Sequence, residues 1–250
     1  ASASCARVAT ARTAVAGHRI DRRGARLITA PMPNDEPPSA SARPLIVARG
    51  WVQATGLVFL AGFFVLGLLA YRTYTASPPI PDTVVDPAGR VVFTGGDVRA
   101  GQAVFLQNGL MAYGSVLGHG AYLGPDFTAD YLRRAADHAI EHHGGPSSPA
   151  AAELTAREFK ENRYDPESHR LEMSASQASA FEAARDHYAA FFGEPTTRWG
   201  LRPGAITDPQ HVRQLTAFFA WTAWAASTRR PGEPYSYTNN WPPEPRVANQ

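Results

Sequence analysis

The 250-residue sequence contains very little cysteine or lysine, and each shortage excludes a class of site. Cys5 is the only cysteine, so the chain can form no internal disulfide and has no CxxC metal motif and no CxxCH haem attachment motif. Lys160 is the only lysine, and arginine supplies the other side-chain positive charges. The sequence also lacks a glycine-rich phosphate loop, a serine nucleophile elbow and a paired-carboxylate signature. Hydrolase and nucleotide-binding functions therefore have no support.

Charge is distributed unevenly, although the formal net charge is only +2. Residues 1–49 carry eight arginines and three acidic residues, whereas residues 73–250 carry 15 basic and 19 acidic residues. A nucleic-acid-binding domain presents a basic face, and the large second segment is instead mildly acidic. We therefore expect no nucleic-acid partner.

Residues 1–44 are rich in Arg, Ala, Ser and Pro and show no hydrophobic period, so we expect a disordered N-terminal tail. Met32 stands where a natural start would, which makes residues 1–31 a candidate upstream extension of the reading frame. The intact mass of the natively expressed protein tests this hypothesis.

Residues 50–71 form a 22-residue run without charge between Arg49 and Arg72. A helix of that length spans about 33 Å, which suits a hydrocarbon core of about 30 Å. We place the transmembrane segment at residues 45–72, with membrane lipid as its partner. The arginine excess before it predicts a cytoplasmic N-terminus, with residues 73–250 in the periplasm, outside a bacterial inner membrane.

A cleaved signal peptide is the alternative interpretation of this run, with Thr75-Ala76-Ser77 as a poor cleavage site. Signal peptides usually have apolar regions of about 7–15 residues, and this run is longer. We therefore favour an uncleaved anchor.

The rest of the chain is expected to be mainly α-helical, with a small β-hairpin at its start. Val84-Val85 and Val91–Phe93 flank the turn sequence Asp86–Gly89, which is typical of a hairpin. Hydrophobic periods and end signals predict helices at 97–107, at 128–143 with Thr128 as the cap, at 152–163, at 174–192 with a Ser174/Gln177 capping box and a Gly193 cap, and from Asp208-Pro209 to about 228.

The last predicted helix is rich in Phe and Trp, but its uncharged stretch, residues 214–228, is too short to span a bilayer. We expect a core helix of the domain. The alternative is a helix that lies near the membrane surface or against a neighbouring helix bundle.

Residues 101–127 are the most informative segment. Their first half resembles the first helix of class I c-type cytochromes, in which a G-x-x-V-F/W stretch runs into C-x-x-C-H. The haem-binding positions fall on Leu110, Tyr113 and Gly114, so both thioether cysteines and the axial histidine are missing. No haem c can be attached without them. We expect a cytochrome c-like fold whose haem space is filled by apolar side chains, among them Met111 and Tyr113.

A wider set of motifs resembles quinol-dependent nitric oxide reductases of the haem-copper oxidase superfamily. The matching segments are the anchor with its PPIPD stalk, FTGGDVRAGQAVFLQNGLMAYGSVLGHGAYLGPDFTADYL, and FFAWTAWAASTRRPGEPYSYTNNWPPEP; residues 144–175 match more loosely. In that family a haem-free cytochrome c-like part is fused to the catalytic part. The resemblance implies a parent enzyme that reduces NO to N2O and water with electrons from quinol.

The resemblance also implies cofactors that lie outside this chain. The parent enzyme carries haem b, haem b3 and non-haem iron in a bundle of membrane helices of the same polypeptide, which we expect to be the partner of this N-terminal portion. We therefore expect no catalytic residue here and no NO reduction by this portion alone. A calcium ion at the junction would take ligands from Gly120 and Tyr122, an incomplete set for a hard cation.

Three further patterns have weaker meanings. His138 and His142 lie four apart on one helix face, a spacing that can bind zinc, but the HExxH order and a third ligand are absent. His119, in a glycine loop, is expected to pack against its neighbours or to support a ligand, rather than to catalyse. Asn239–Trp241, before two prolines, is interpreted as a docking strap and not as a catalytic site.

A stand-alone, membrane-anchored periplasmic binding module without enzymatic activity is the alternative function. The two hypotheses differ in the sequence expected after Gln250. A series of apolar segments with metal-spaced histidines would favour the reductase, and a stop codon would favour the module.

Overall fold

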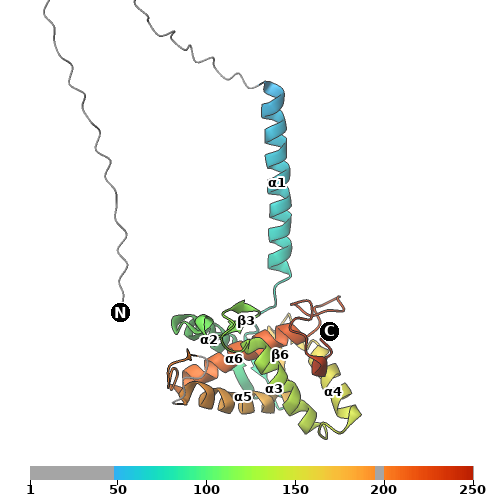
Figure 1. The fold of residues 1–250 in the computed structure, drawn as a ribbon. Coiled ribbons are helices and arrows are strands. Elements are labelled where there is room, and N and C mark those ends of the chain that lie inside the picture. The colour runs from blue at the N-terminus through green and yellow to red at the C-terminus, as the bar shows by residue number, and fades with distance from the viewer. Residues whose placement is uncertain (1–47, 195–199, 250) are drawn as a thin grey trace, which may run out of the picture. The chain divides into compact units, whose positions relative to one another are not determined.

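The computed structural model describes residues 48–194 and 200–249, and these residues are mainly helical (Figure 1). One long apolar helix precedes a helical domain that contains short strands. The expected fold class, mainly α with one apolar N-terminal helix and a small hairpin, is confirmed. The predicted tail at residues 1–44 lies outside the described residues.

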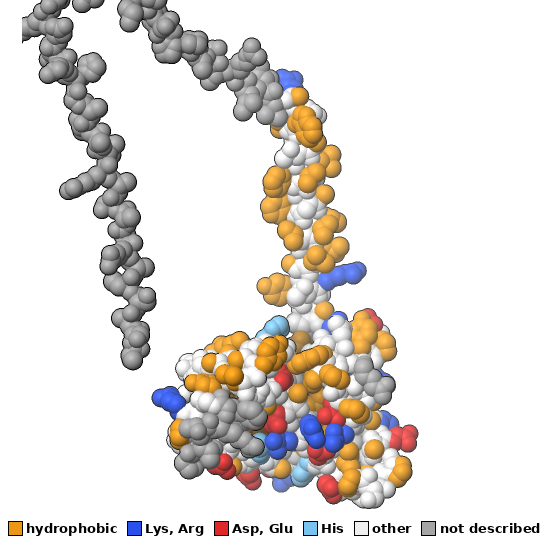
Figure 2. All heavy atoms as spheres, viewed as in Figure 1, with side chains coloured by type: hydrophobic (Ala, Val, Ile, Leu, Met, Phe, Trp, Pro, Cys, Tyr) orange, Lys and Arg blue, Asp and Glu red, His pale blue; other side chains and the backbone are white. Residues whose placement is uncertain are grey.

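Helix α1, Arg49–Thr75, is the only described helix that is long and apolar enough to cross a membrane. None of its side chains is buried. Figure 2 shows apolar side chains along α1, whereas the visible face of the domain mixes apolar, acidic and basic side chains. A helix whose exposed surface is almost wholly apolar suits a bilayer better than water. This composition supports membrane anchoring.

Four short strands form one mixed sheet in the order β2-β1-β6-β5. Strands β1 (Thr83–Val85) and β2 (Val91–Thr94) pair antiparallel, which confirms the predicted hairpin. Strand β6 (Arg170–Glu172) pairs parallel with β1 and antiparallel with β5 (Tyr164–Asp165). Strands β5 and β6 were not predicted from the sequence, because strands of two or three residues have no readable period.

Helix α6, Pro209–Ser227, is the central core helix of the domain. The Asp208 side chain caps it by accepting a hydrogen bond from the Gln210 N–H at 2.9 Å, as the sequence predicts. Leu215 and Phe219 are fully buried, and α6 packs against α2, α3 and α5. The expectation of a core helix, rather than a helix on a membrane surface, is confirmed.

The other α-helices of the domain contact α6, and two short 3-10 turns complete the helical elements of the described residues (Figure 1). They are α2 (Gly95–Gln107), η1 (Leu110–Ala112), α3 (Phe127–His142), α4 (Pro149–Lys160), α5 (Ala175–Gly193) and η3 (Pro245–Val247). Helix α2 crosses α6 closely at Gly101, where an added Cβ would lie 1.9 Å from the carbonyl oxygen of Gln214. Only glycine permits this approach.

Two predicted helix starts need correction. Helix α2 begins at Gly95, two residues earlier than predicted, because Thr94 and Asp97 form a reciprocal capping box. Helix α3 is capped by Asp126, whose carboxylate accepts from the Ala129 N–H at 3.0 Å. The prediction that Thr128 caps this helix is therefore wrong.

The ends of α4 and α5 also differ from prediction in part. Helix α4 starts after its cap Ser148, earlier than the predicted residues 152–163. The capping box of Ser174 and Gln177 at α5 is confirmed. Gly193 is the last residue of α5 and has no positive φ, so the prediction that it caps the helix is wrong.

Candidate functional site

The segment between α2 and α3 contains the positions that bind haem in c-type cytochromes. After α2, Gly109 takes a left-handed conformation (φ 61°) and starts the η1 turn. The side chain of Leu110 is 1 % exposed and belongs to the hydrophobic core. Tyr113 is half-buried against that core, and Gly114 is buried. The three positions thus lie in a well-packed part of the domain.

These three residues cannot hold a haem c group. Leu110 and Tyr113 supply no thiol for a thioether bond, and Gly114 supplies no axial ligand. A Cβ added at Gly114 would lie 2.6 Å from the carbonyl oxygen of Pro125 and 2.7 Å from a ring carbon of Phe127. The position therefore has no room even for a methyl group, and the chain's own residues do not fit haem c here.

Aromatic side chains fill the centre of the domain beside this segment. The rings of Phe127 and Phe219 stack with centroids 4.7 Å apart, and Phe105 meets both rings edge-on. Met111, which was expected among the fillers, is 41 % exposed, so that prediction is wrong. The tight η1 turn directs Leu110 inward and its neighbour Met111 outward.

Asp126 fixes the loop that follows these positions, a role that was not predicted from the sequence. The loop contains the two-residue strands β3 (Ser115–Val116) and β4 (His119–Gly120). One carboxylate oxygen of Asp126 accepts hydrogen bonds from the Ser115 hydroxyl at 2.7 Å and the Gly118 N–H at 2.8 Å. An aspartate just before a predicted helix was the available signal. Its second task, holding the loop, could not be foreseen.

In the turn at Gly120 and Tyr122, backbone contacts hold the main chain in place, and the Tyr122 side chain is exposed to solvent. Gly120 has φ 142°, and a Cβ there would lie 2.3 Å from the carbonyl oxygen of Gly114. The next residue, Ala121, donates its N–H to the carbonyl of Met111 at 2.8 Å. The side chain of Tyr122 is 89 % exposed. The two predicted site residues are therefore neighbours in space, and the tyrosine is free to meet a partner.

Exposed apolar side chains are grouped around this turn. We call those that lie on the turn or in contact with its segment the apolar turn surface: Met111, Tyr122, Leu123 and Trp241. The Trp241 ring belongs to this region because it lies 3.2 Å from the point where a Gly118 Cβ would stand. A cluster of exposed apolar side chains on a domain often marks a surface that binds another molecule.

Metal ligands do not converge at this turn. Within residues 48–194 and 200–249, no three His, Cys, Asp or Glu side chains form a group that could hold a metal ion. Gly120 can offer a carbonyl oxygen and Tyr122 a phenol oxygen, whereas calcium takes about six to eight oxygen ligands. These residues can therefore contribute only one side of a calcium site.

The histidines have separate partners. His138 bonds through Nε2 to the Ser179 hydroxyl at 2.9 Å, and His143 lies 2.7 Å from a carboxylate oxygen of Glu158. The ring of His142 packs edge-on against that of His143. His119 is exposed on β4, so it does not pack in the core, and its supporting role beside a ligand stays a prediction.

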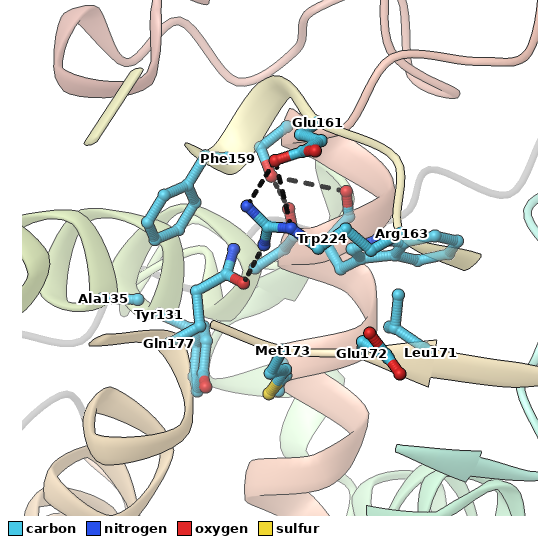
Figure 3. Close-up of a pocket in the computed structure, with 13 residues that line it drawn as sticks. Tyr131, Ala135, Phe159, Glu161, Arg163, Leu171, Glu172, Met173, Gln177 and Trp224 are labelled. Carbon is cyan, nitrogen blue, oxygen red and sulfur yellow. Dashed lines mark hydrogen bonds and ion pairs between the residues drawn. The ribbon is translucent and has the colours of Figure 1, made fainter. Parts of the chain in front are cut away.

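A small internal cavity of about 30 Å³ lies between β6, α3, α5 and α6 (Figure 3). Arg163 borders it and donates to the carboxylate of Glu161 at 2.7 Å and to the amide oxygen of Gln177 at 3.2 Å. Trp224, on the cavity wall, has a buried ring N–H without a hydrogen-bond partner among the described residues. This volume holds one or two water molecules and no organic substrate.

The C-terminal segment is fastened to the domain by Lys160, another residue whose role was not predicted from the sequence. The ammonium group donates to the amide oxygens of Asn240 at 3.1 Å and Asn249 at 2.5 Å. Burial, with a smaller contribution from the nearby charge of Arg229, lowers the pKa of Lys160 from 10.5 to about 8. The segment predicted as a docking strap is thus bound to its own domain, and its docking role stays a prediction.

The fold and the replaced ligand positions define a cytochrome c-like domain that has no residues for haem c attachment, in a chain with one apolar helix before it. The family model for the NorB cytochrome c-like domain of nitric oxide reductase matches residues 81–243, and the chain belongs to this family. No curated protein matches the chain. The resemblance to nitric oxide reductases is therefore confirmed at the level of the family.

Proposed function

We propose that the chain is the membrane anchor and cap of a nitric oxide reductase that takes its electrons from quinol. The family gives the oxidoreductase context. The proposal adds the quinol donor, a bacterial inner membrane, a cytoplasmic N-terminus and a periplasmic location for residues 73–250. It also assigns NO reduction to a bundle of membrane helices of the same polypeptide, with haem b, haem b3 and non-haem iron.

One observation carries the proposal: the domain belongs to a cytochrome c-like family, but the positions that would attach haem c hold Leu110, Tyr113 and Gly114. Leu110 and Gly114 are buried, and Gly114 has no space for a side chain. A domain of this kind cannot pass electrons from a soluble cytochrome c through a haem of its own. Quinol, a membrane electron donor, would reduce the catalytic part directly, so the domain would need no haem to relay electrons.

The capping role rests on the apolar turn surface. Covering exposed side chains such as Tyr122 and Leu123 with another apolar surface is favourable. The ends of the catalytic membrane helices are the proposed cover. The domain would then shield those ends from water and hold the Gly120–Tyr122 turn against them.

Calcium has a defined place in this proposal. The Gly120 carbonyl and the Tyr122 phenol would supply oxygen ligands from one side, and the catalytic part would supply the others. The ion would bind the two parts together electrostatically. The residues of the turn suit this role because their backbone is fixed and the Tyr122 side chain is exposed.

The test uses the complete enzyme in lipid nanodiscs, with NO consumption measured by an NO electrode. Ubiquinol should sustain turnover, and reduced cytochrome c should not. Leu123→Glu should impair turnover or release the domain, because it places a charge in the covered surface. Val91→Glu, at an exposed valine on β2, is the matched control and should leave turnover unchanged. Turnover with cytochrome c as the only donor would refute the proposal.

A further inference from the structure

A groove of about 950 Å³ lies between helix α4 and the end of the C-terminal segment. Three of its lining residues are cations: Arg157 and Lys160 from α4, and Arg229 from the residues just after α6. Ala248 forms part of the other wall. The groove is far larger than the internal cavity and opens to solvent. It therefore has room for an organic or inorganic ion.

The backbone brings the three cations together. Arg157 and Lys160 are three residues apart on α4, so their side chains lie on one face of the helix. The Arg229 N–H donates to the carbonyl oxygen of Lys160 at 3.1 Å, which joins the third cation to the pair. The charges of Lys160 and Arg229 are close enough to repel each other. Of the three, only Lys160 is buried, so its charge has lost most of its water and would gain most from a bound anion.

Lys160 makes this more than a cluster of surface charges. Its residue is only 7 % exposed, and its two hydrogen-bond partners are neutral amide oxygens, from Asn240 and Asn249. No carboxylate of the described residues lies within 4.0 Å of the ammonium group. An ammonium has three donors, so one stays available after these two bonds.

The two carboxylates in the groove do not cancel the positive charge. The Glu161 carboxylate is bound to the guanidinium of Arg163 at 2.7 Å, which occupies it. Glu153 precedes Arg157 by one helical turn but forms no ion pair within the part of the chain that the structure describes. Three cations therefore face one uncommitted carboxylate.

We propose that this groove is a binding site for a phosphate-type oxyanion. The oxyanion would lie between the guanidinium groups of Arg157 and Arg229, which match phosphate oxygens in geometry, with Lys160 at the inner end. The chemistry suits both a phospholipid headgroup and free inorganic phosphate. The anchor helix α1 keeps the chain at a membrane, where phospholipid headgroups are abundant.

The sequence provides a sharp probe, because Lys160 is the only lysine of the chain. Full-length protein labelled with 13C-lysine, in a phosphate-free detergent, gives a single lysine ε-carbon resonance. Addition of inorganic phosphate at constant ionic strength should move this resonance saturably. An equal concentration of chloride should not move it. An equal response to both salts would mean general screening of charge and would overturn the proposal.

Variants locate the binding. Arg157→Gln and Arg229→Gln should each weaken phosphate binding about tenfold, the effect of losing one charged hydrogen-bonding partner. Glu153→Gln, in the same groove, is the matched control and should leave binding unchanged or tighten it. Neither arginine has a described ion pair, so the variants should fold, and circular dichroism verifies this. Unchanged affinity in both arginine variants would also overturn the proposal.

A second arm separates the two sources of phosphate. The labelled protein is placed in nanodiscs of phosphatidylcholine alone or with phosphatidylglycerol, in phosphate-free buffer. A shift of the lysine resonance that needs phosphatidylglycerol and is lost in Arg229→Gln assigns the site to an anionic headgroup. A response to inorganic phosphate only assigns it to a free ion. A resonance that responds to neither excludes the site.

Discussion

The Thr128 hydroxyl donates a hydrogen bond to the Thr222 hydroxyl at 3.1 Å, and this bond joins α3 to α6. The same Thr128 oxygen accepts a hydrogen bond from the Leu117 N–H of the loop at 3.0 Å. The Thr222 hydroxyl in turn donates to the Phe219 carbonyl oxygen. Both threonines are fully buried. A polar chain therefore connects the loop beside the replaced haem positions to the core helix.

Thr128→Val should lower the free energy of unfolding by about 1–3 kcal/mol. Valine keeps the shape of threonine but leaves the Leu117 N–H without its partner and removes the donor to Thr222. Urea unfolding followed by circular dichroism measures the change. Thr155→Val is the matched control, because the buried Thr155 hydroxyl has no described partner. Equal losses in the two variants would contradict the importance of the polar chain.

Gly101→Ala should destabilise the domain by about 1–3 kcal/mol or force α2 away from α6. An added Cβ would meet the carbonyl of Gln214 at 1.9 Å, which no rotamer change can relieve. Gly96→Ala in the same helix meets only the Thr94 hydroxyl at 3.4 Å and should be neutral or stabilising. Thermal unfolding of both variants checks the contrast. Similar melting temperatures would mean that the α2–α6 crossing is looser than described.

Lys160 should make stability depend on pH in a window from about pH 8 to 10.5. The pKa of its amine falls from 10.5 in the unfolded chain to about 8 in the fold, so the unfolded state binds more protons within the window. Stability attributable to this residue therefore rises with pH across the window, and the burial penalty is fully present below pH 8.

The measurement for this dependence is the difference in unfolding free energy between the natural protein and Lys160→Met. The difference should move in favour of the natural protein between pH 8 and pH 10. Tyr131 and Tyr188 are buried and have raised pKa values, so they change the stability of both proteins and cancel in the difference. A difference that stays constant over this range would rule out a perturbed Lys160.

Tyr122→Ala should leave the stability of the domain within about 0.5 kcal/mol of the natural protein, because this side chain is almost fully exposed. In the complete enzyme the same change should lower the calcium content and NO turnover if the turn helps to hold the ion. Calcium is measured by inductively coupled plasma mass spectrometry. Leu154→Ala, an exposed apolar control on α4, should affect neither. Full calcium content in Tyr122→Ala would remove this residue from the proposed site.

The helices were predicted well where the capping residues and the apolar stripe indicated the same helix start. Asp208 with Pro209 located the start of α6, and the Ser174/Gln177 capping box located that of α5. The start of α3 was misplaced because Asp126 and Thr128 are both good caps, and only the tertiary fold decides between them. Thr128 is instead part of the link to α6.

Features that depend on distant contacts could not be read from the sequence. Strand β1 pairs parallel with β6, which places Val84 beside Leu171 although three α-helices separate them in the sequence. Lys160 became significant only when the fold placed Asn240 and Asn249 around its ammonium group. The replaced haem positions were predictable because they follow a fixed local spacing, whereas the outward direction of Met111 depends on the η1 turn.

The central claim is that this cytochrome c-like domain has no haem of its own. A pyridine haemochrome assay and a visible absorption spectrum of the purified 250-residue chain, produced with the haem c maturation system, test it most directly. We expect no haem signal, since Leu110, Tyr113 and Gly114 provide neither thioether cysteines nor an axial ligand. A stoichiometric haem spectrum would contradict this claim and would mean that the domain carries electrons itself.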